Sequence, residues 1–235
     1  MSIFDFIKGL PLYLDKPKDA ERLNNRHRFI IQPYQHDIQD ARVLDLASHD
    51  GRWPFAFASA GAREVIGIEG RPELIAKFDD YPPDPAKERV RLLQGDINEE
   101  VPRLAAEGER FDVVSVLGIY YHITTHYSLL AQIKALGPRL IIIDSEFQNT
   151  KDPIIRLVKE DTRKNMNSLA YFDGQVKAVK GVPSRGAMEM MAESLGYVVE
   201  WLDWERLPPK DRVGVADYYR KGPKTRGTCA LRPAG

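Results

Sequence analysis

The sequence predicts an α/β fold built on a Rossmann-like, doubly wound sheet of mostly parallel strands. Short apolar segments rich in β-branched residues alternate with segments of helical character, which is typical of βαβ units. The apolar segments also contain too few polar residues for strands that are exposed on one face. The predicted strands are residues 42–47, 64–68, 90–93, 111–117 and 140–144.

Helices are predicted between these strands, at residues 53–60, 72–78, 101–106 and 127–136. Pro72 and Pro102 fit the first turn of a helix, where a missing backbone N–H costs nothing. Gly61 and Gly137 fit positions just after a helix, where left-handed backbone is common. Strands and helices therefore alternate as a parallel sheet requires.

The C-terminal part departs from this alternation. Residues 147–183 are charged and lack a regular hydrophobic period, and we expect them to form an insertion that acts as a lid and selects the substrate. Ser184 is a suitable N-cap for a helix at residues 185–195. Strands at residues 197–204 and 227–232 are expected to form an antiparallel hairpin at the end of the sheet.

Composition limits the class of protein. The 235 residues fit one large domain at residues 41–235, preceded by a helical extension at residues 1–40. Lys and Arg total 34 and Asp and Glu total 34, a balance that argues against nucleic acid as a partner. The single cysteine, Cys229, excludes an internal disulfide framework and suits a reducing compartment, so a cytoplasmic protein is expected.

The N-terminal segment is not expected to be a targeting sequence. No apolar run reaches the ~18 residues of a membrane span, and Asp5 and Lys8 interrupt the apolar stretch of residues 1–14. The apolar side chains in this segment can instead cover a partner or the lid, which leaves a homodimer open.

Three carboxylates follow successive predicted strands and describe a pocket for adenosine. Asp45 lies in the first strand, Glu69 ends the second, and Asp96 follows the third. An acidic residue at the end of the second strand can accept both hydroxyls of a ribose. Asp96 is placed to accept a hydrogen bond from an adenine amino group. The alternative is that these side chains only cap turns.

The turn after the first strand decides between adenosine cofactors. A pyrophosphate needs several glycines so that backbone amides can approach it. Here Ala47 and His49 stand where glycines would be expected, and only Gly51 remains. This pattern argues against a nicotinamide or flavin dinucleotide.

Residues 42–232 resemble the class I S-adenosylmethionine-dependent methyltransferases, on the motifs at residues 42–51, 65–69, 93–96, 111–122 and 140–144. The resemblance implies S-adenosylmethionine as cofactor. It also implies that Asp45 orients the turn and the amino end of the methionine, that Glu69 holds the ribose, and that Asp96 holds the adenine. The remaining cofactor residues implied are Ala47, His49, Gly51, Ile97, Leu117 and Gly118.

The fourth predicted strand delivers the residues expected to meet the acceptor. His122 is the candidate general base, because an imidazole titrates near neutral pH, and Tyr120 and Tyr121 are expected to wall the pocket. The alternative is that His122 caps a helix. Asp144 is the second candidate catalytic residue, either as a metal ligand or as the carboxylate that orients His122.

A metal site is a further expectation at this edge of the sheet. Asp144, Glu146 and His126 follow neighbouring strands, and oxygen and imidazole ligands of this kind suit a hard divalent ion such as Mg²⁺. Such an ion would lower the pKa of a diol in the acceptor.

These residues favour O-methylation of a sugar or another small polyol, in a chain that is similar to actinobacterial saccharide methyltransferases in its size and first turn. Two alternatives stay open. Residues 118–122 and the pair Pro183-Ser184 also resemble a family of wobble-uridine carboxymethyltransferases that act on tRNA. The chain can also be a non-catalytic subunit that binds adenosine.

Overall fold

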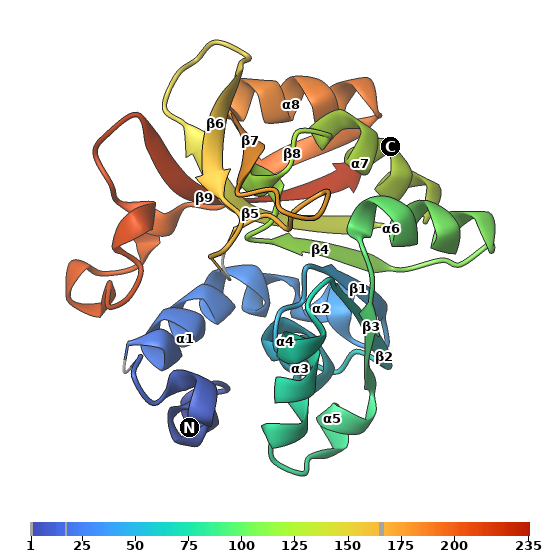
Figure 1. Cartoon of the computed structure of the whole chain (residues 1–235), viewed down its shortest axis with the longest axis vertical. Coiled ribbons are helices and arrows are strands. Elements are labelled where there is room, and N and C mark those ends of the chain that lie inside the picture. The colour runs from blue at the N-terminus through green and yellow to red at the C-terminus, as the bar shows by residue number, and fades with distance from the viewer. Residues whose placement is uncertain (1, 17, 165–166) are drawn as a thin grey trace.

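The structure, a computed structural model, describes residues 2–16, 18–164 and 167–235. Within these residues, seven strands form one sheet in the order β3-β2-β1-β4-β5-β9-β8. Figure 1 shows α6, α7 and α8 above this sheet and α1 to α5 below it. The predicted Rossmann-like fold of mostly parallel strands is confirmed.

The strands are β1 (Arg42–Leu46), β2 (Glu64–Glu69), β3 (Val90–Gln94), β4 (Val113–Leu117), β5 (Leu140–Gln148), β6 (Ile155–Asp161), β7 (Lys177–Pro183), β8 (Tyr197–Trp201) and β9 (Lys224–Pro233). The helices are α1 (Asp19–Ile30), α2 (Gln35–Ile38), α3 (Arg52–Ser59), α4 (Pro72–Ile75), α5 (Pro85–Glu88), α6 (Ile97–Ala106), α7 (His126–Ala135) and α8 (Arg185–Ser194). Strand β9 runs antiparallel to both β5 and β8, as the C-terminal hairpin prediction requires.

The insertion is more regular than its sequence suggested. Residues 155–183 contain the antiparallel pair β6 and β7, which forms a separate two-stranded sheet. Strand β5 also runs on to Gln148, four residues beyond its predicted end, and bridges to Ser184 there. Helix α6 begins at Ile97, so Pro102 lies inside it rather than in its first turn.

The N-terminal extension packs against the chain's own core. Phe4 is fully buried and meets Trp53 of α3 edge to face, with ring centroids 5.4 Å apart. Phe6 contacts Phe55 and Tyr81 in the same way. Phe4 and Phe6, which the sequence suggested could cover a partner or the lid, therefore pack against α3 and Tyr81 of the same chain. No helix in the part of the chain that the structure describes is long and apolar enough to cross a membrane.

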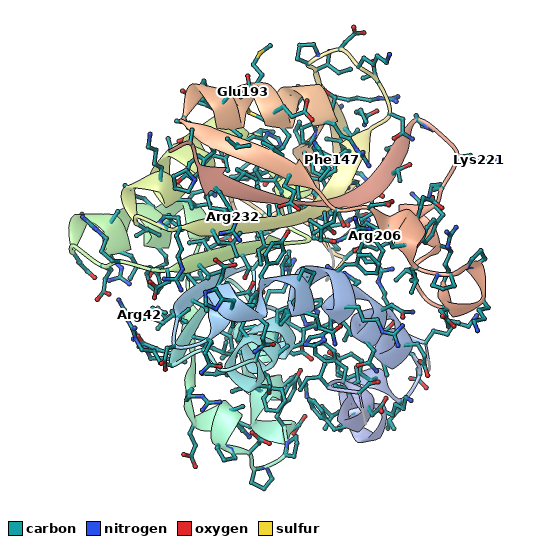
Figure 2. All side chains as sticks on the ribbon, turned by 180° about the vertical axis from the view of Figure 1, so that it is seen from behind. Arg42, Phe147, Glu193, Arg206, Lys221 and Arg232 are labelled. Carbon is teal, nitrogen blue, oxygen red and sulfur yellow. The ribbon has the colours of Figure 1, made fainter. Side chains whose placement is uncertain are left out.

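The carboxyl ends of the parallel strands meet at one edge of the sheet. Figure 2 shows Arg42, at the start of β1, and Lys221, in the loop before β9, on opposite sides of the molecule. Ligands of open α/β sheets bind at the carboxyl edge, where the strand order reverses. In this sheet the reversal lies between β1 and β4.

The turn after β1 adopts glycine-like backbone at residues that are not glycine. Ala47 has φ 59° and His49 has φ 56°, beside Gly51 at φ 80°. Left-handed backbone costs a residue with a Cβ about 1–2 kcal/mol. The turn thus keeps the shape of a glycine-rich loop, and the strain is stored beside the predicted cofactor site.

Replacing Ala47 with glycine is expected to stabilise the protein by about 1 kcal/mol, because glycine adopts this backbone without strain. Urea unfolding checks this, with a higher midpoint at an unchanged m value. The control is Ala105→Gly within helix α6, which should lower the free energy of unfolding by about 0.5–1 kcal/mol. A lowered midpoint for Ala47→Gly would contradict the stored strain.

Candidate active site

Two adjoining cavities lie at the carboxyl edge of the sheet. Their volumes are about 360 Å³ and about 270 Å³. We call the larger the acceptor cavity and the smaller the adenosine cavity. Six residues line both, so the cavities meet along this set: Ala47, Glu69, Arg71, Ile119, His122 and Asn167.

Glu69 is fixed at the boundary between the cavities. One carboxylate oxygen accepts a hydrogen bond from the backbone N–H of His49 at 2.9 Å, and the other accepts one from the N–H of Arg71 at 3.0 Å. The side chain is 5% exposed. A carboxylate has about four lone-pair sites, so two remain for the hydroxyls of a sugar.

The ring of His49 is held by charged neighbours. Its Nδ1 lies 2.6 Å from Nη2 of Arg52 and 3.2 Å from the carboxylate of Asp50. Asp50 in turn accepts a hydrogen bond from the hydroxyl of Tyr13 at 2.5 Å. Burial lowers the pKa of His49, and Asp50 only partly offsets this. A neutral ring therefore lines the acceptor cavity.

The adenosine cavity contains two of the predicted adenine residues. Asp96 and Ile97 line it, together with residues 167–171 from the insertion. Asp96 also caps α6 by accepting a hydrogen bond from the N–H of Asn98 at 2.8 Å. Residues of the insertion therefore form part of the wall of this cavity.

Two predicted cofactor residues lie behind the cavities rather than in them. Asp45 is 1% exposed and accepts a hydrogen bond from the hydroxyl of Ser115 at 2.5 Å. Burial raises its pKa to about 7. Gly51 packs so closely on Phe78 that a Cβ would clash with the ring. Neither residue lines either cavity, so the structure does not bring Asp45 or Gly51 to the space where the cofactor is predicted to bind.

His122 is oriented by a carboxylate that the sequence did not single out. Its Nδ1 lies 2.8 Å from Oε1 of Glu160, which is on strand β6 of the insertion. Both side chains are 5% exposed. Glu160 is held by the N–H of Ser168 at 2.9 Å and by Lys180 at 2.9 Å. With Nδ1 directed at Glu160, Nε2 of His122 is left for the cavities that the residue lines.

The pKa values of this pair support a neutral imidazole. Burial lowers the pKa of His122, and the hydrogen bond to Glu160 only partly offsets it. Burial opposes ionisation of Glu160, but hydrogen bonds from His122 and Ser168 outweigh it and lower its pKa to about 2. At neutral pH the arrangement is a neutral histidine beside a carboxylate, which is the form a general base needs.

Asp144 does not orient His122. Its Oδ1 accepts hydrogen bonds from Arg26 at 2.9 Å and Arg226 at 2.7 Å, and its Oδ2 accepts them from Tyr218 at 2.5 Å and Thr228 at 2.7 Å. The carboxylate is fully buried and does not line the acceptor cavity. The prediction of a catalytic Asp144 is wrong, since four neighbours occupy its oxygens.

The predicted metal ligands are also engaged elsewhere. Nε2 of His126 lies 3.0 Å from the carbonyl oxygen of Gly181. Glu146 pairs with Arg220 at 3.3 Å and with Lys224. Within the described residues, no group of three or more His, Cys, Asp or Glu side chains is arranged to hold a metal ion. The metal site predicted at Asp144, Glu146 and His126 is not formed.

The aromatic residues after β4 divide between core and cavity. Tyr120 is fully buried and packs edge to face on His126, with ring centroids 4.8 Å apart. Tyr121 lines the acceptor cavity with Leu117 and Gly118. Of the two residues predicted to wall the pocket, only Tyr121 therefore lines the acceptor cavity.

Three arginines that were not among the predicted site residues line the acceptor cavity. Arg22 and Arg26 of α1 and Arg226 of β9 line it. The four-residue spacing of Arg22 and Arg26 places both on one face of a helix. That spacing was available in the sequence, whereas the approach of β9 to α1 depends on the fold.

Comparisons with solved structures identify the fold. The N-terminal domain of EvdMO1 in the presence of SAH (S-adenosylhomocysteine) and D-fucose superposes with a TM-score of 0.63 at 17% identity, over 92% of this chain and 82% of that one. The DhpI–SAH complex gives 0.59 at 16% identity, over 97% and 90%. A didemethyltoxoflavin N1-methyltransferase of Burkholderia thailandensis gives 0.55 at 17%, over 98% and 86%. The chain has the methyltransferase fold.

Sequence comparison finds tRNA carboxymethyltransferases as relatives. No protein-family model matches the chain. A tRNA U34 carboxymethyltransferase of Shewanella oneidensis is 27% identical over 154 residues, which is 60% of this chain and 42% of that protein. One from Pseudoalteromonas translucida is 24% identical over 170 residues, or 71% and 48%. The chain thus spans less than half the length of these curated relatives.

Replacing Asp144 with asparagine is expected to destabilise the protein by about 3–5 kcal/mol, because two buried guanidinium groups lose their shared counter-charge. Thermal and urea unfolding measure the change. The control is Glu107→Gln, whose ion pair with Arg103 is about half exposed and whose loss should change stability little. Equal stability of Asp144→Asn and wild type would contradict a stabilising role for the charge of Asp144 beside Arg26 and Arg226.

Proposed function

We propose that the protein is an S-adenosylmethionine-dependent methyltransferase that methylates a hydroxyl group of a small polyol such as a sugar. The observation that carries this proposal is the position of Glu69 and His122 on the boundary between two adjoining cavities. One cavity suits adenosine, and the other suits the methionine end and an acceptor. SAH in the structural neighbours supports the choice of cofactor.

The residues of the adenosine cavity would hold the nucleoside. The free lone pairs of Glu69 accept the ribose hydroxyls, and Asp96 and Ile97 meet the adenine. Ala47, Leu117, Gly118 and the neutral ring of His49 line the acceptor cavity and would border the methionine end. The described residues of the two cavities offer hydrogen-bonding groups and apolar walls that fit S-adenosylmethionine. When bound, this cofactor would supply a methyl group from a positively charged sulfur.

His122 would remove the proton of the acceptor hydroxyl. Its Nε2 is unprotonated when Nδ1–H is donated to Glu160, so it could accept the hydroxyl proton. The hydroxyl oxygen would bond to the methyl carbon as the carbon–sulfur bond breaks, and the sulfur would leave as the neutral thioether of SAH. The imidazolium that forms is stabilised by the Glu160 carboxylate, as in histidine–carboxylate pairs of hydrolases. The lid strand β6 thus supplies the positioning residue, and the sheet supplies the base.

Sugars and other polyols are the favoured acceptors. Part of the acceptor cavity is lined by groups that hydrogen-bond, and D-fucose accompanies SAH in the EvdMO1 structure. The predicted cation assistance is not part of this proposal, since the residues named for Mg²⁺ are bonded to other side chains or to backbone.

A second candidate function is carboxymethyl transfer to tRNA. The sequence match to the Shewanella and Pseudoalteromonas enzymes favours it, whereas the net charge of zero does not. Filter binding with tRNA distinguishes the two, because specific tRNA binding should fall steeply with salt. Binding of this kind would favour the tRNA function over the small-molecule function.

Replacing Glu69 with alanine is expected to weaken SAH binding by at least about 100-fold, because two hydrogen bonds to a charged acceptor are lost. Isothermal titration calorimetry measures the dissociation constant. The control is Glu73→Ala, an exposed residue of α4 that lines neither cavity. Failure of the wild-type protein to bind SAH or S-adenosylmethionine would overturn the proposed function.

His122→Gln is expected to reduce kcat/KM about 10²–10⁴-fold, as for loss of a general base. The wild-type rate should fall as the pH drops below the pKa of His122, which is lower than its usual value. Glu160→Gln removes a charge that raises that pKa, so its acid limb should move to lower pH while its plateau falls about 10–100-fold.

The control for this pair is Glu193→Gln, an exposed residue of α8 (Figure 2) that lines neither cavity. It should keep the wild-type rate and pH profile. An unchanged acid limb in Glu160→Gln would show that Glu160 only packs against the ring. Wild-type activity of His122→Gln would show that His122 is not the general base.

A further inference from the structure

One wall of the acceptor cavity is built from three arginines. Arg22 and Arg26 come from α1, and Arg226 comes from β9. Arg26 is 6% exposed and Arg226 is 7% exposed. Guanidinium groups are seldom buried without a negative partner.

Two carboxylates balance these three cations. Asp144 accepts hydrogen bonds from both Arg26 and Arg226. Asp217 pairs in a two-pronged manner with Arg22, at 2.7 Å and 2.8 Å, and lies 3.9 Å from Nε of Arg226. Three positive groups and two negative groups leave one positive charge on this wall.

The other charged groups of the cavity have their own partners or lie apart. Arg52 pairs with Asp50 at 2.6 Å, and Arg71 donates to the carbonyl of Asn167 at 2.8 Å. Glu146 forms ion pairs with Arg220 and Lys224, so this group of three side chains carries a net positive charge. Glu69 lies toward the adenosine cavity, and the half-exposed Asp19 sits in the first turn of α1.

Donors on this wall remain free. Among the described residues, Arg226 donates only through Nε and Arg26 only through Nε and Nη2. Both Nη groups of Arg226 and Nη1 of Arg26 therefore have no protein acceptor there. Within the described residues, these unpartnered nitrogen atoms are not fully enclosed by protein, so a ligand in the cavity can reach them.

Arg226 also lies where the acceptor is expected. A Cβ placed on Gly118 would come within 3.2 Å of its Nη2, and Gly118 directly follows strand β4, which leads to His122. The guanidinium carbon is 5.6 Å from the ring centre of Tyr121, which lines the same cavity. The free donors and the candidate base thus border one space.

We infer that the acceptor carries an anionic group, a carboxylate or a phosphate, which binds the free donors of Arg226 and Arg26 while its hydroxyl meets His122. This inference rests on the proposed function. A planar guanidinium presents paired N–H groups that match two oxygens of such an anion. The ligand supplies the negative charge that the wall lacks, and a neutral sugar leaves those donors to water.

Isothermal titration on the full chain saturated with SAH tests this with glucose, glucuronate and glucose 6-phosphate as probes. The anionic compounds should bind at least about tenfold more tightly than glucose, since a hydrogen bond between charged groups is worth about 1.5–3 kcal/mol. In Arg226→Met this preference should disappear. The control Arg28→Met, an exposed residue of the same helix α1, should keep it.

Arg226→Lys guards against misfolding, because it keeps the charge beside Asp144 but loses the planar pair of donors. It should melt near the wild-type temperature and still bind the anionic compounds about tenfold more weakly. Equal binding of glucose and glucuronate by the wild type, or an undiminished preference in both Arg226 variants, would overturn the inference.

The SAH titration separates the two proposals. If Arg226→Lys weakens SAH binding more than about tenfold while the acceptor preference persists, the arginine holds the cofactor's own carboxylate and the inference about the acceptor is wrong. If the wild type binds the anionic sugars through Arg226 but binds no SAH, the anion site stands and the proposed function fails.

Discussion

The carboxylate of Asp144 holds together the side of the molecule on which the acceptor cavity lies. Its four hydrogen bonds come from α1, from the loop that carries Tyr218, and from two residues of β9. Removing this charge would leave two buried guanidinium groups facing each other, so the interaction constrains the packing of three separate chain segments. Arg26 and Arg226 can line a cavity only because Asp144 neutralises part of their charge from behind.

The central sheet and the cofactor side follow from local sequence. Strands β1, β2 and β4 are mostly apolar. Glu69 ends β2 and Asp96 follows the end of β3 by two residues, so their common edge is fixed by strand polarity alone. The glycine-like turn also keeps its shape with Ala47 and His49, because β1 and α3 on either side determine the backbone. Local pattern was sufficient wherever neighbours in sequence are also neighbours in space.

The acceptor side was predicted less well, because its contacts join residues far apart in sequence. Glu160 is 38 residues from His122, and Arg226 is 82 residues from Asp144. In sequence, Glu160 is one of several charges in a segment without a regular period, and Asp144 looks like any carboxylate at a strand end. Which histidine meets which carboxylate depends on how the β6–β7 pair folds back over the sheet, and no local spacing encodes that.

The placement of Glu160 on the insertion has a consequence for engineering. In many folds the loops that choose a substrate can be exchanged while the reactive groups stay on the scaffold. Here the strand that would be exchanged also carries the partner of His122. A transplanted hairpin would therefore have to bring a carboxylate at the position of Glu160, within reach of Lys180, which lies diagonally across the strand pair. Under the proposed function, exchange of this hairpin would alter substrate selectivity and the reactivity of His122 together.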